Sequence, residues 1–344
     1  MTKISIAPFL FYMLKRLATL GIMYLITLSV LFALPRLIPS NPVAIYVEQV
    51  VEQYGYLTNP DLVPKQYKAM IEEFGFGKPL WEQYVDFLVK AFRGDLGTSI
   101  WLYPSRVLDV IMGSLPWTLF LLIPSSLIGW YLGNLWGART GFKRGSIFEK
   151  FSVVFSSTIA QIPSYWLAML LIYGFAVYLR LLPSGRAYDP TVPPSLSIDY
   201  ALNVLKHYIL PFTAITVPYL CGQVLTMRNL IIYELKSDYT VFGDYIGLRE
   251  KVVRKYAFRN AVMPQIVGLS IRLGRTVAGA ALVEALFSYP GMGYYMAQAV
   301  SNNDYMLLQG IFVILVATVY LAIFISDLVH MIIDPRVRLG YVKQ

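Results

Sequence analysis

The feature that most constrains this chain is a series of long, almost uncharged apolar runs. A bilayer core of about 30 Å is crossed by about 20 apolar helical residues. Only 14% of the residues are charged, against about 25% in a typical soluble domain. Six runs are long enough to cross a bilayer, at about 17–34, 115–137, 151–182, 208–227, 263–287 and 306–333. The sequence therefore predicts an all-α membrane protein with six transmembrane helices.

Prolines interrupt several of these runs, at Pro124, Pro163, Pro211 and Pro218. In lipid, such a break is tolerated where neighbouring helices or a water-lined cavity satisfy the freed carbonyl groups. The prolines fit simple kinks in a packed bundle, and they also fit kinks that let a pathway open.

Basic residues are distributed unevenly between the two sides that the runs define. The side with residues 1–16, 138–150, 228–260 and 334–344 carries about twice as many Lys and Arg as the other. Cytoplasmic loops of membrane proteins carry such an excess. We therefore expect a multi-pass protein of the cell membrane with both termini in the cytoplasm. The net charge of +9 is explained by this asymmetry and by contact with lipid, and nucleic acid is not needed.

The first run begins after basic residues, as a secretory signal does, but no small-x-small cleavage site follows it. The chain continues LPRLIPSNP. We expect an uncleaved first helix.

The segment between the first two runs, residues 36–114, is the largest polar part of the chain. Residues 65–74 (KQYKAMIEEF) and 80–92 (LWEQYVDFLVKAF) have the apolar spacing of amphipathic helices. They predict a small helical external segment between helices 1 and 2, with a plain connecting loop as the alternative.

Glycines recur at four-residue spacing in the second run, at Gly129, Gly133 and Gly137. Small residues at this spacing let helix backbones approach closely. We expect tight helix packing on this face.

The longest connection on the basic side covers about residues 228–260 and contains the turn-forming Gly243 and Gly247. Helices are expected on both sides of Gly247, and Pro264 follows just inside the next run. A polar segment of this size, joined directly to two membrane helices, fits a docking element for a cytoplasmic partner.

Residues 236–264 read KSDYTVFGDYIGLREKVVRKYAFRNAVMP. This segment resembles the cytoplasmic coupling loop of ABC importer permeases of the oligopeptide/dipeptide/nickel class. The residues on that pattern are Asp238, Tyr239, Gly247, Leu248, Arg259, Asn260, Ala261 and Pro264. Further matches in order along nearly the whole chain are RGDLGTS (93–99), LPWT (115–118), IPSYW (162–166), LPSG (182–185), EALFSYPGMG (284–293), DY (304–305), QG (309–310) and DPRVR (334–338).

The resemblance implies the type I ABC importer permease fold and a translocation pathway for oligopeptides or dipeptides. It divides the chain into residues 1–113 (a transmembrane helix and external cap), 114–333 (the permease core) and 334–344 (a cytoplasmic tail). It also implies a second homologous permease subunit, two cytoplasmic ABC ATPase subunits that use ATP and Mg, and an external solute-binding protein that delivers the substrate.

The chain departs from the family at Phe242, Gly243, Asp244, Tyr245 and Ile246, where the family usually has alanines and basic residues. This stretch is bulkier and less basic, so the contact with the ATPase is expected to differ in detail. Gly243 and Asp244 nevertheless belong to the expected coupling loop.

Catalytic motifs are absent from the sequence. It has no G-x-x-x-x-G-K-[ST] phosphate loop, no H-E-x-x-H and no G-x-S-x-G. One cysteine, Cys221, allows no intrachain disulfide and no cysteine-based zinc cage. We expect no enzymatic activity, cofactor or metal site in this chain.

Charged residues inside the runs are the remaining candidates. Arg272 and Arg275 each cost about 2.5–3.5 kcal/mol if they face lipid, so we expect them to face water, a partner or an acid. With Glu284 they are candidates for the translocation pathway, and structural pairing with the partner permease is the alternative. Asp327 and His330 share a helix face, which favours a local hydrogen bond over a proton relay.

The substrate is less constrained than the transporter class. Peptides come first, oligosaccharides second because aromatic rings stack on sugars, and nickel complexes last because the chain has only two histidines. A secondary transporter coupled to an ion gradient is the rival class, and it would depend on Glu284 and Asp327.

Overall fold

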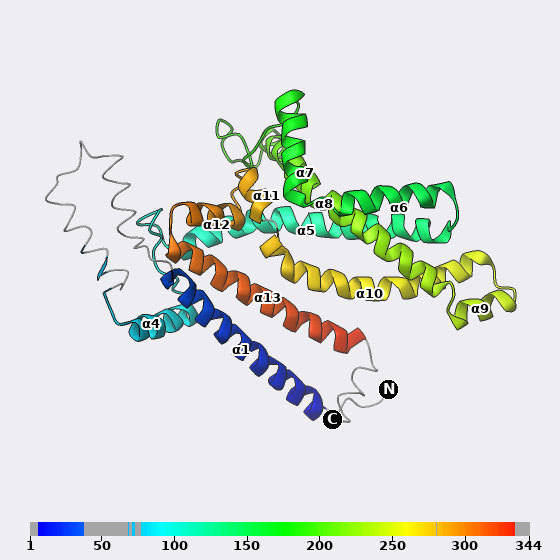
Figure 1. Ribbon diagram of the computed structural model, residues 1–344, viewed down its shortest axis with the longest axis horizontal. Helices are drawn as coiled ribbons and strands as arrows, with labels where there is room; N and C mark the ends of the chain where they lie inside the picture. Colours follow the sequence, from blue (N-terminus) through cyan, green and yellow to red (C-terminus); the bar gives the residue numbers. More distant parts are fainter. Residues whose placement is uncertain (1–5, 38–67, 69–70, 73–76, 280, 334–344) are drawn as a thin grey trace. The chain divides into compact units, whose positions relative to one another are not determined.

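In the computed structural model the chain is described for residues 6–37, 68, 71–72, 77–279 and 281–333. These residues form helices joined by turns (Figure 1). In chain order the helices are α1 (Ile6–Arg36), α4 (Leu80–Arg93), α5 (Val107–Phe142), α6 (Ile147–Ala160), α7 (Ser164–Leu171), the π-helix η1 (Ile172–Tyr178), α8 (Ile198–Glu234), α9 (Asp238–Tyr245), α10 (Glu250–Gly279), α11 (Ala281–Leu286), α12 (Met292–Ser301) and α13 (Tyr305–Ile333).

Four helices are long and apolar enough to cross a membrane: Met13–Arg36 within α1, Val107–Phe142, Ile198–Glu234, and Tyr305–Ile325 within α13. A fifth span is possible where α6 is followed by α7 and η1, which together form a pair bent by 94°. The bend falls at Pro163, which occupies the N-cap of α7. The described residues thus give an all-helical protein with four or five candidate spans. Each coincides with one of the expected runs.

The remaining expected run, 263–287, falls on α10 and α11. It is helical on both sides of residue 280, but α10 is less apolar than the other long helices because it begins with the basic residues that precede Pro264 and later carries two arginines. In the expected external segment, residues 80–92 are confirmed as α4. The expected helix at 65–74 lies almost entirely outside the described residues.

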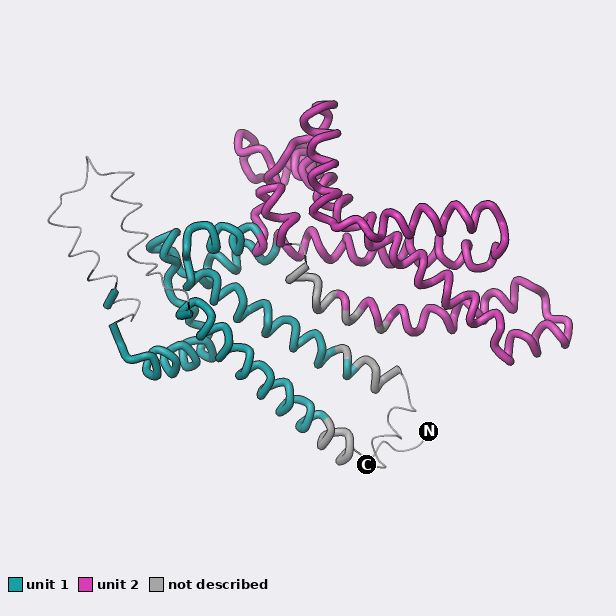
Figure 2. The backbone as a smooth tube through the Cα atoms, in the orientation of Figure 1, with its two compact units in different colours: residues 1–116, 294–344 teal, residues 117–293 magenta. Residues whose placement is uncertain are grey.

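The chain forms two compact units (Figure 2). Unit 1 comprises Met1–Pro116 and Tyr294–Gln344, and unit 2 comprises Trp117–Gly293. The expected domain boundaries after residues 113 and 333 remain a prediction.

In unit 1, α1 and α13 lie side by side (Figure 1). Near one end of the pair, the Gln309 side-chain amide donates to the carbonyl oxygen of Leu31 at 3.0 Å. Near the other end, Arg16 forms an ion pair with Asp327 at 2.7 Å. Asp327 therefore has a partner on another helix, where the sequence favoured a local one. The side chain of His330 lies outside the described residues.

Asp304 joins the turn after α4 to the start of α13. Its buried carboxylate accepts hydrogen bonds from the Ser99 hydroxyl and the Trp101 backbone N–H, the latter at 3.0 Å. It also accepts from the backbone N–H of Leu307 at 2.9 Å, in the first turn of α13. A buried carboxylate is stable when such donors surround it. Two of the expected motifs, RGDLGTS and the DY pair, therefore serve one structural contact.

In unit 2, the glycine face of α5 packs directly on α8. A Cβ atom at Gly137 would lie 2.5 Å from the carbonyl oxygen of Val224, and one at Gly133 would lie 2.7 Å from that of Leu220. Gly129 similarly leaves no room beside α8. The close packing expected from the four-residue spacing is confirmed.

A second part of unit 2 is formed by the motifs LPSG and EALFSYPGMG. The backbone N–H of Arg186 donates to the carbonyl oxygen of Phe287 at 2.6 Å. A Cβ atom at Gly185 would lie 2.5 Å from the same oxygen, so a side chain there would prevent the contact. Phe287 and Tyr289 are buried in the adjoining apolar cluster together with Leu121 of α5.

Candidate functional site

The expected coupling loop forms a compact helix-turn-helix element between α8 and α10. The Ser237 hydroxyl donates to the carbonyl oxygen of Glu234 at 2.6 Å, and the Thr240 hydroxyl donates to the same oxygen at 2.8 Å. These bonds satisfy a carbonyl group left free at the end of α8. They fix the turn that separates α8 from α9, which begins at Asp238.

Tyr239 supports the same turn. Its hydroxyl donates to the side-chain carboxylate of Glu234. Burial raises the pKa of the Tyr239 hydroxyl, and the neighbouring Glu234 carboxylate raises it further. The hydroxyl therefore remains protonated and available as a donor at neutral pH.

The end of α9 depends on Gly247. Its backbone φ of +77° lies in the left-handed region, which glycine adopts without steric cost. The Gly247 N–H donates to the carbonyl oxygen of Asp244, and the Leu248 N–H donates to that of Gly243, both at 3.0 Å. Gly247 is thus the turn residue that the sequence predicts, with helices on both sides. Gly243 instead lies inside α9, buried against Leu248.

Apolar side chains project from this element. Tyr245 is 86% exposed and Phe242 is 63% exposed. We call the exposed apolar residues of α9 and the following turn the coupling patch: Val241, Phe242, Tyr245, Ile246 and Leu248. An exposed apolar patch on a protein surface is typical of an interaction site.

The buried side of α9 packs on α10, since a Cβ atom at Gly243 would lie 3.6 Å from the Val253 side chain, and α10 is in turn packed on two other long helices. Ala138 of α5, Met227 and Ile231 of α8, and Ala261 of α10 form one buried cluster. On α10, Arg259 and Asn260 lie on the exposed side, next to the buried Ala261. Because the cluster is closely packed, a force on α9 is transmitted to α8 and α10 rather than absorbed by a mobile loop.

Polar contacts extend this anchor to the middle of α10. Pro264 lies inside α10, where it cannot donate a backbone hydrogen bond. The next residue, Gln265, is buried and accepts on its backbone oxygen from the indole N–H of Trp130 of α5 at 3.0 Å. Its side-chain oxygen accepts from the Gln223 amide of α8 at 3.1 Å. The three helices are therefore joined beside Pro264.

An ion pair connects α6 to the same region. The Arg228 Nε of α8 donates to Glu149 at 2.9 Å. Glu149 also accepts from the backbone N–H of Gly145, and its own N–H donates to the Ser146 hydroxyl at 3.2 Å. Sequence reasoning missed this pair, although Ser146 and Glu149 have the spacing of a capping box, which identifies the start of α6.

The candidate pathway residues are not gathered at one place. The Arg272 guanidinium carbon lies 3.4 Å from the ring centroid of Tyr219 of α8. The side chain of Arg275 lies outside the described residues. Glu284 is buried, and its carboxylate accepts from the backbone N–H of Gly293 at 2.6 Å within the EALFSYPGMG turn. The structure assigns Glu284 a contact in this turn, and its role in a pathway stays a prediction.

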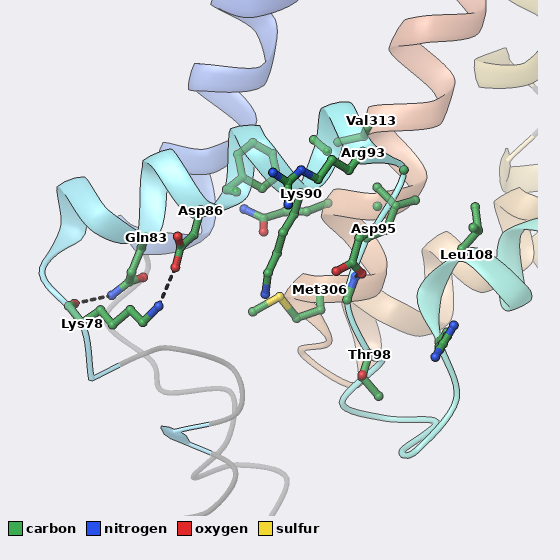
Figure 3. A pocket seen from close by; sticks show the side chains of 18 of the residues that line it. Lys78, Gln83, Asp86, Lys90, Arg93, Asp95, Thr98, Leu108, Met306 and Val313 are labelled. Atoms are coloured by element: carbon green, nitrogen blue, oxygen red, sulfur yellow. Dashed lines mark hydrogen bonds and ion pairs between the residues drawn. The ribbon is translucent and has the colours of Figure 1, made fainter.

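Unit 1 contains a polar pocket with a volume of about 540 Å³ (Figure 3). Its wall is formed by α4, the turn after it and the first turns of α13. Lys78 pairs with Asp86 across its edge at 2.6 Å. Lys90, Arg93 and Arg106 also line it. Sequence reasoning did not foresee this pocket, because residues from several separate segments form it, among them Arg36 of α1 and Leu108 of α5.

Comparison with known proteins agrees with these features. Residues 125–339 match the family described as binding-protein-dependent transport system inner membrane component. The dipeptide transport system permease protein DppB of Escherichia coli strain K12 is 30% identical over 328 residues, covering 89% of this chain and 92% of that protein.

Two further relatives extend over similar lengths. The di/tripeptide transport system permease protein DppB of Pseudomonas aeruginosa is 30% identical, covering 89% of this chain and 92% of that protein. The oligopeptide transport system permease protein AppB of Bacillus subtilis is 25% identical, covering 95% of this chain and 99% of that protein. The chain therefore belongs to the family of binding-protein-dependent transport system inner membrane components, as a multi-pass helical permease whose ATPase resides in separate subunits.

Proposed function

We propose that this chain is the permease of an ATP-driven importer of peptides, and that the coupling patch is where a cytoplasmic ATPase pushes on it. The observation that carries the proposal is the construction of the α9 element. Its apolar residues are exposed on one side, its other side packs on α10, and a buried cluster joins α10 to α5 and α8. Such an element transmits a displacement to the membrane helices.

The complete transporter contains this chain, a second homologous permease, two cytoplasmic ABC ATPases that use ATP and Mg, and an external binding protein that delivers the substrate. The permease has six transmembrane helices, with α10 and α11 forming the fifth and both termini in the cytoplasm. The basic residues of α10 then face the ATPases, which fits the excess of basic residues on that side.

Peptides are the proposed substrate because the three relatives described above are named for dipeptides, di/tripeptides and oligopeptides. These names give no support to the oligosaccharide or nickel alternatives. Arg272 and Arg275 suit such a substrate, since a guanidinium group binds a peptide carboxylate through paired hydrogen bonds. We place both arginines, with Glu284, along the proposed pathway.

The coupling proposal is tested in the purified transporter reconstituted into liposomes with its ATPases and binding protein. Tyr245→Asp places a charge in the coupling patch, where burying it against the ATPase is costly. We expect it to reduce ATP-driven dipeptide uptake by at least about tenfold, because a loss of about 1.4 kcal/mol in docking suffices for that factor. Tyr245→Phe keeps the apolar surface and serves as the matched control.

Wild-type rates in Tyr245→Asp would contradict the assigned contact. A transporter that moves dipeptide without ATP, or that never co-purifies with an ATPase, would instead support the ion-coupled secondary transporter. Uptake that fails for dipeptides and oligopeptides but proceeds for an oligosaccharide would overturn the proposed substrate alone.

A further inference from the structure

The helix α4 has an apolar stripe that the described part of unit 1 leaves largely exposed. Trp81, Val85, Val89 and Phe92 are spaced by four, four and three residues, so they lie on one face of the helix. Their exposed fractions are 67%, 47%, 42% and 62%. None of the 14 residues of α4 is fully buried.

A neighbouring face of α4 packs on α1. The Tyr84 hydroxyl lies 2.7 Å from the Ser29 hydroxyl, and the Arg36 guanidinium donates to the Gln83 side chain at 3.2 Å. Because the Arg36 guanidinium lies over the ring of Phe32, these contacts hold the first half of α4 at the level of residues 29–32 of α1.

The second half of α4 runs back along α1. The ring of Phe92 packs edge-on against the ring of Tyr24, with centroids 6.2 Å apart. The ring of Tyr84, near the start of α4, packs against the ring of Phe32, with centroids 5.2 Å apart, and Phe32 lies about 12 Å from Tyr24 along the axis of α1. From Tyr84 to Phe92, α4 therefore descends beside α1 by about 12 Å, against about 30 Å for a whole bilayer core.

The depth of α4 beside α1 determines whether lipid or water surrounds the stripe. Met13–Arg36 is the apolar segment of α1 that qualifies as a membrane span, and Tyr24 is near its centre. On α1 the lipid-facing surface is marked by the exposed side chains of Ile22, Ile26 and Val30, again at four-residue spacing. α4 contacts α1 at Tyr24, Ser29 and Phe32, at the same level as these side chains, so its stripe is exposed at the same depth.

The remaining face of α4 is charged and lines the polar pocket. Figure 3 shows Asp86, Lys90 and Arg93 on the pocket side of the helix, with Met306 and Val313 of α13 across from them. Charged groups at this depth need water or a partner. A pocket of about 540 Å³ has room for several waters.

We propose that α4 is a re-entrant interfacial helix, embedded in the half of the bilayer on the Arg36 side, whose stripe contacts phospholipid acyl chains while its charged face borders a hydrated pocket. Amphipathic helices with aromatic and aliphatic residues opposite basic ones bind membranes in this way. A stripe of four apolar side chains without a charged residue is better suited to contact with lipid than to contact with a partner protein in water.

The experiment is a lipid-accessibility measurement on the assembled transporter in nanodiscs of phosphatidylethanolamine and phosphatidylglycerol. Cys221 is the single cysteine of the chain, so Cys221→Ala gives a clean background for spin labels. Labels at Val85→Cys and Val89→Cys test the stripe, Ile26→Cys is the lipid-facing reference, and Lys90→Cys is the matched control on the pocket face of the same helix. Collision rates with oxygen, which partitions into lipid, and with a water-soluble nickel chelate are compared.

We expect the two stripe labels to show an oxygen-to-nickel ratio close to that of the Ile26 label and several-fold above that of the Lys90 label. Nickel accessibility at Val85 and Val89 equal to that at Lys90 would overturn the proposal, because the stripe would face water. Protection from both reagents would also overturn it, because another protein chain would then cover the stripe.

A second measurement avoids the labels. Replacing the acyl chains with brominated ones should quench the fluorescence that Trp81 contributes, obtained as the difference between wild type and Trp81→Phe. A Trp81 contribution that bromination leaves unchanged would contradict contact with acyl chains.

Discussion

At Arg272 the guanidinium stacks on the aromatic ring of Tyr219. Stacking of this kind contributes about 0.5–2 kcal/mol when the cation is desolvated. It offsets part of the cost of placing a charged group in a membrane helix. The side chain is only half-buried, so one part of it is left accessible to a ligand.

Substitution of Arg272 separates a role in substrate binding from a role in packing. Arg272→Gln removes the charge, and we expect the KM for peptide uptake to rise several-fold while the ATPase rate without substrate is unchanged. Arg272→Lys keeps the charge but loses the planar group, and should recover part of the affinity. Uptake kinetics identical to wild type in Arg272→Gln would remove Arg272 from the pathway.

At the scale of elements, the packing of α5 on α8 depends on the absence of side chains. Gly137 meets the backbone of α8 at a distance that no Cβ atom tolerates, whereas nothing lies within 4 Å of a Cβ atom at Gly113 of the same helix. Without a hydrophobic driving force between helices in lipid, such close backbone approach is a main source of helix association.

Gly137→Val should therefore destabilise the protein, since overpacking typically costs about 1–3 kcal/mol. We expect a thermal unfolding midpoint several degrees below wild type for the detergent-purified transporter. Gly113→Val, in the same helix with open space around it, is the control and should shift the midpoint much less. Equal midpoints for the two variants would show that the tight α5–α8 contact does not limit stability.

At the scale of the whole molecule, the proposed six spans and cytoplasmic termini give a prediction for each side of α8. In intact cells, a membrane-impermeant maleimide should label Ser195→Cys, which precedes α8. It should label Lys236→Cys, which follows α8, only after the membrane is permeabilised. Lys343→Cys should behave like Lys236→Cys, because an odd number of further spans separates Ser195 from the C-terminus. Labelling of Lys343→Cys in intact cells would contradict six spans.

Much of the fold follows from local sequence patterns. Run length and low charge identify the membrane helices, since lipid requires each span to satisfy its own backbone hydrogen bonds. The spacing of Gly129, Gly133 and Gly137 predicts close packing, and Gly247 predicts the turn after α9. The expected run at 263–287 coincides with α10 and α11 although Arg272 and Arg275 lower its apolar character.

The partners of the polar side chains could not be predicted in this way. Arg16 pairs with Asp327 across 311 positions of the chain, and Arg228 pairs with Glu149 across 79. Nothing local distinguishes these residues from other charged residues at helix ends. The same holds for Trp130, whose contact with Gln265 spans 135 positions.

By itself, the sequence determined that this protein is helical, lies in the membrane and has the motifs of a permease. These properties depend on residues that are close along the chain. Only the tertiary structure decided that α9 packs on α10, that a buried cluster joins α10 to α5 and α8, that Glu284 supports a turn, and that α4 descends beside α1. These features depend on which distant segments pack together. The sequence of an exposed apolar helix face does not show which other helix lies beside it.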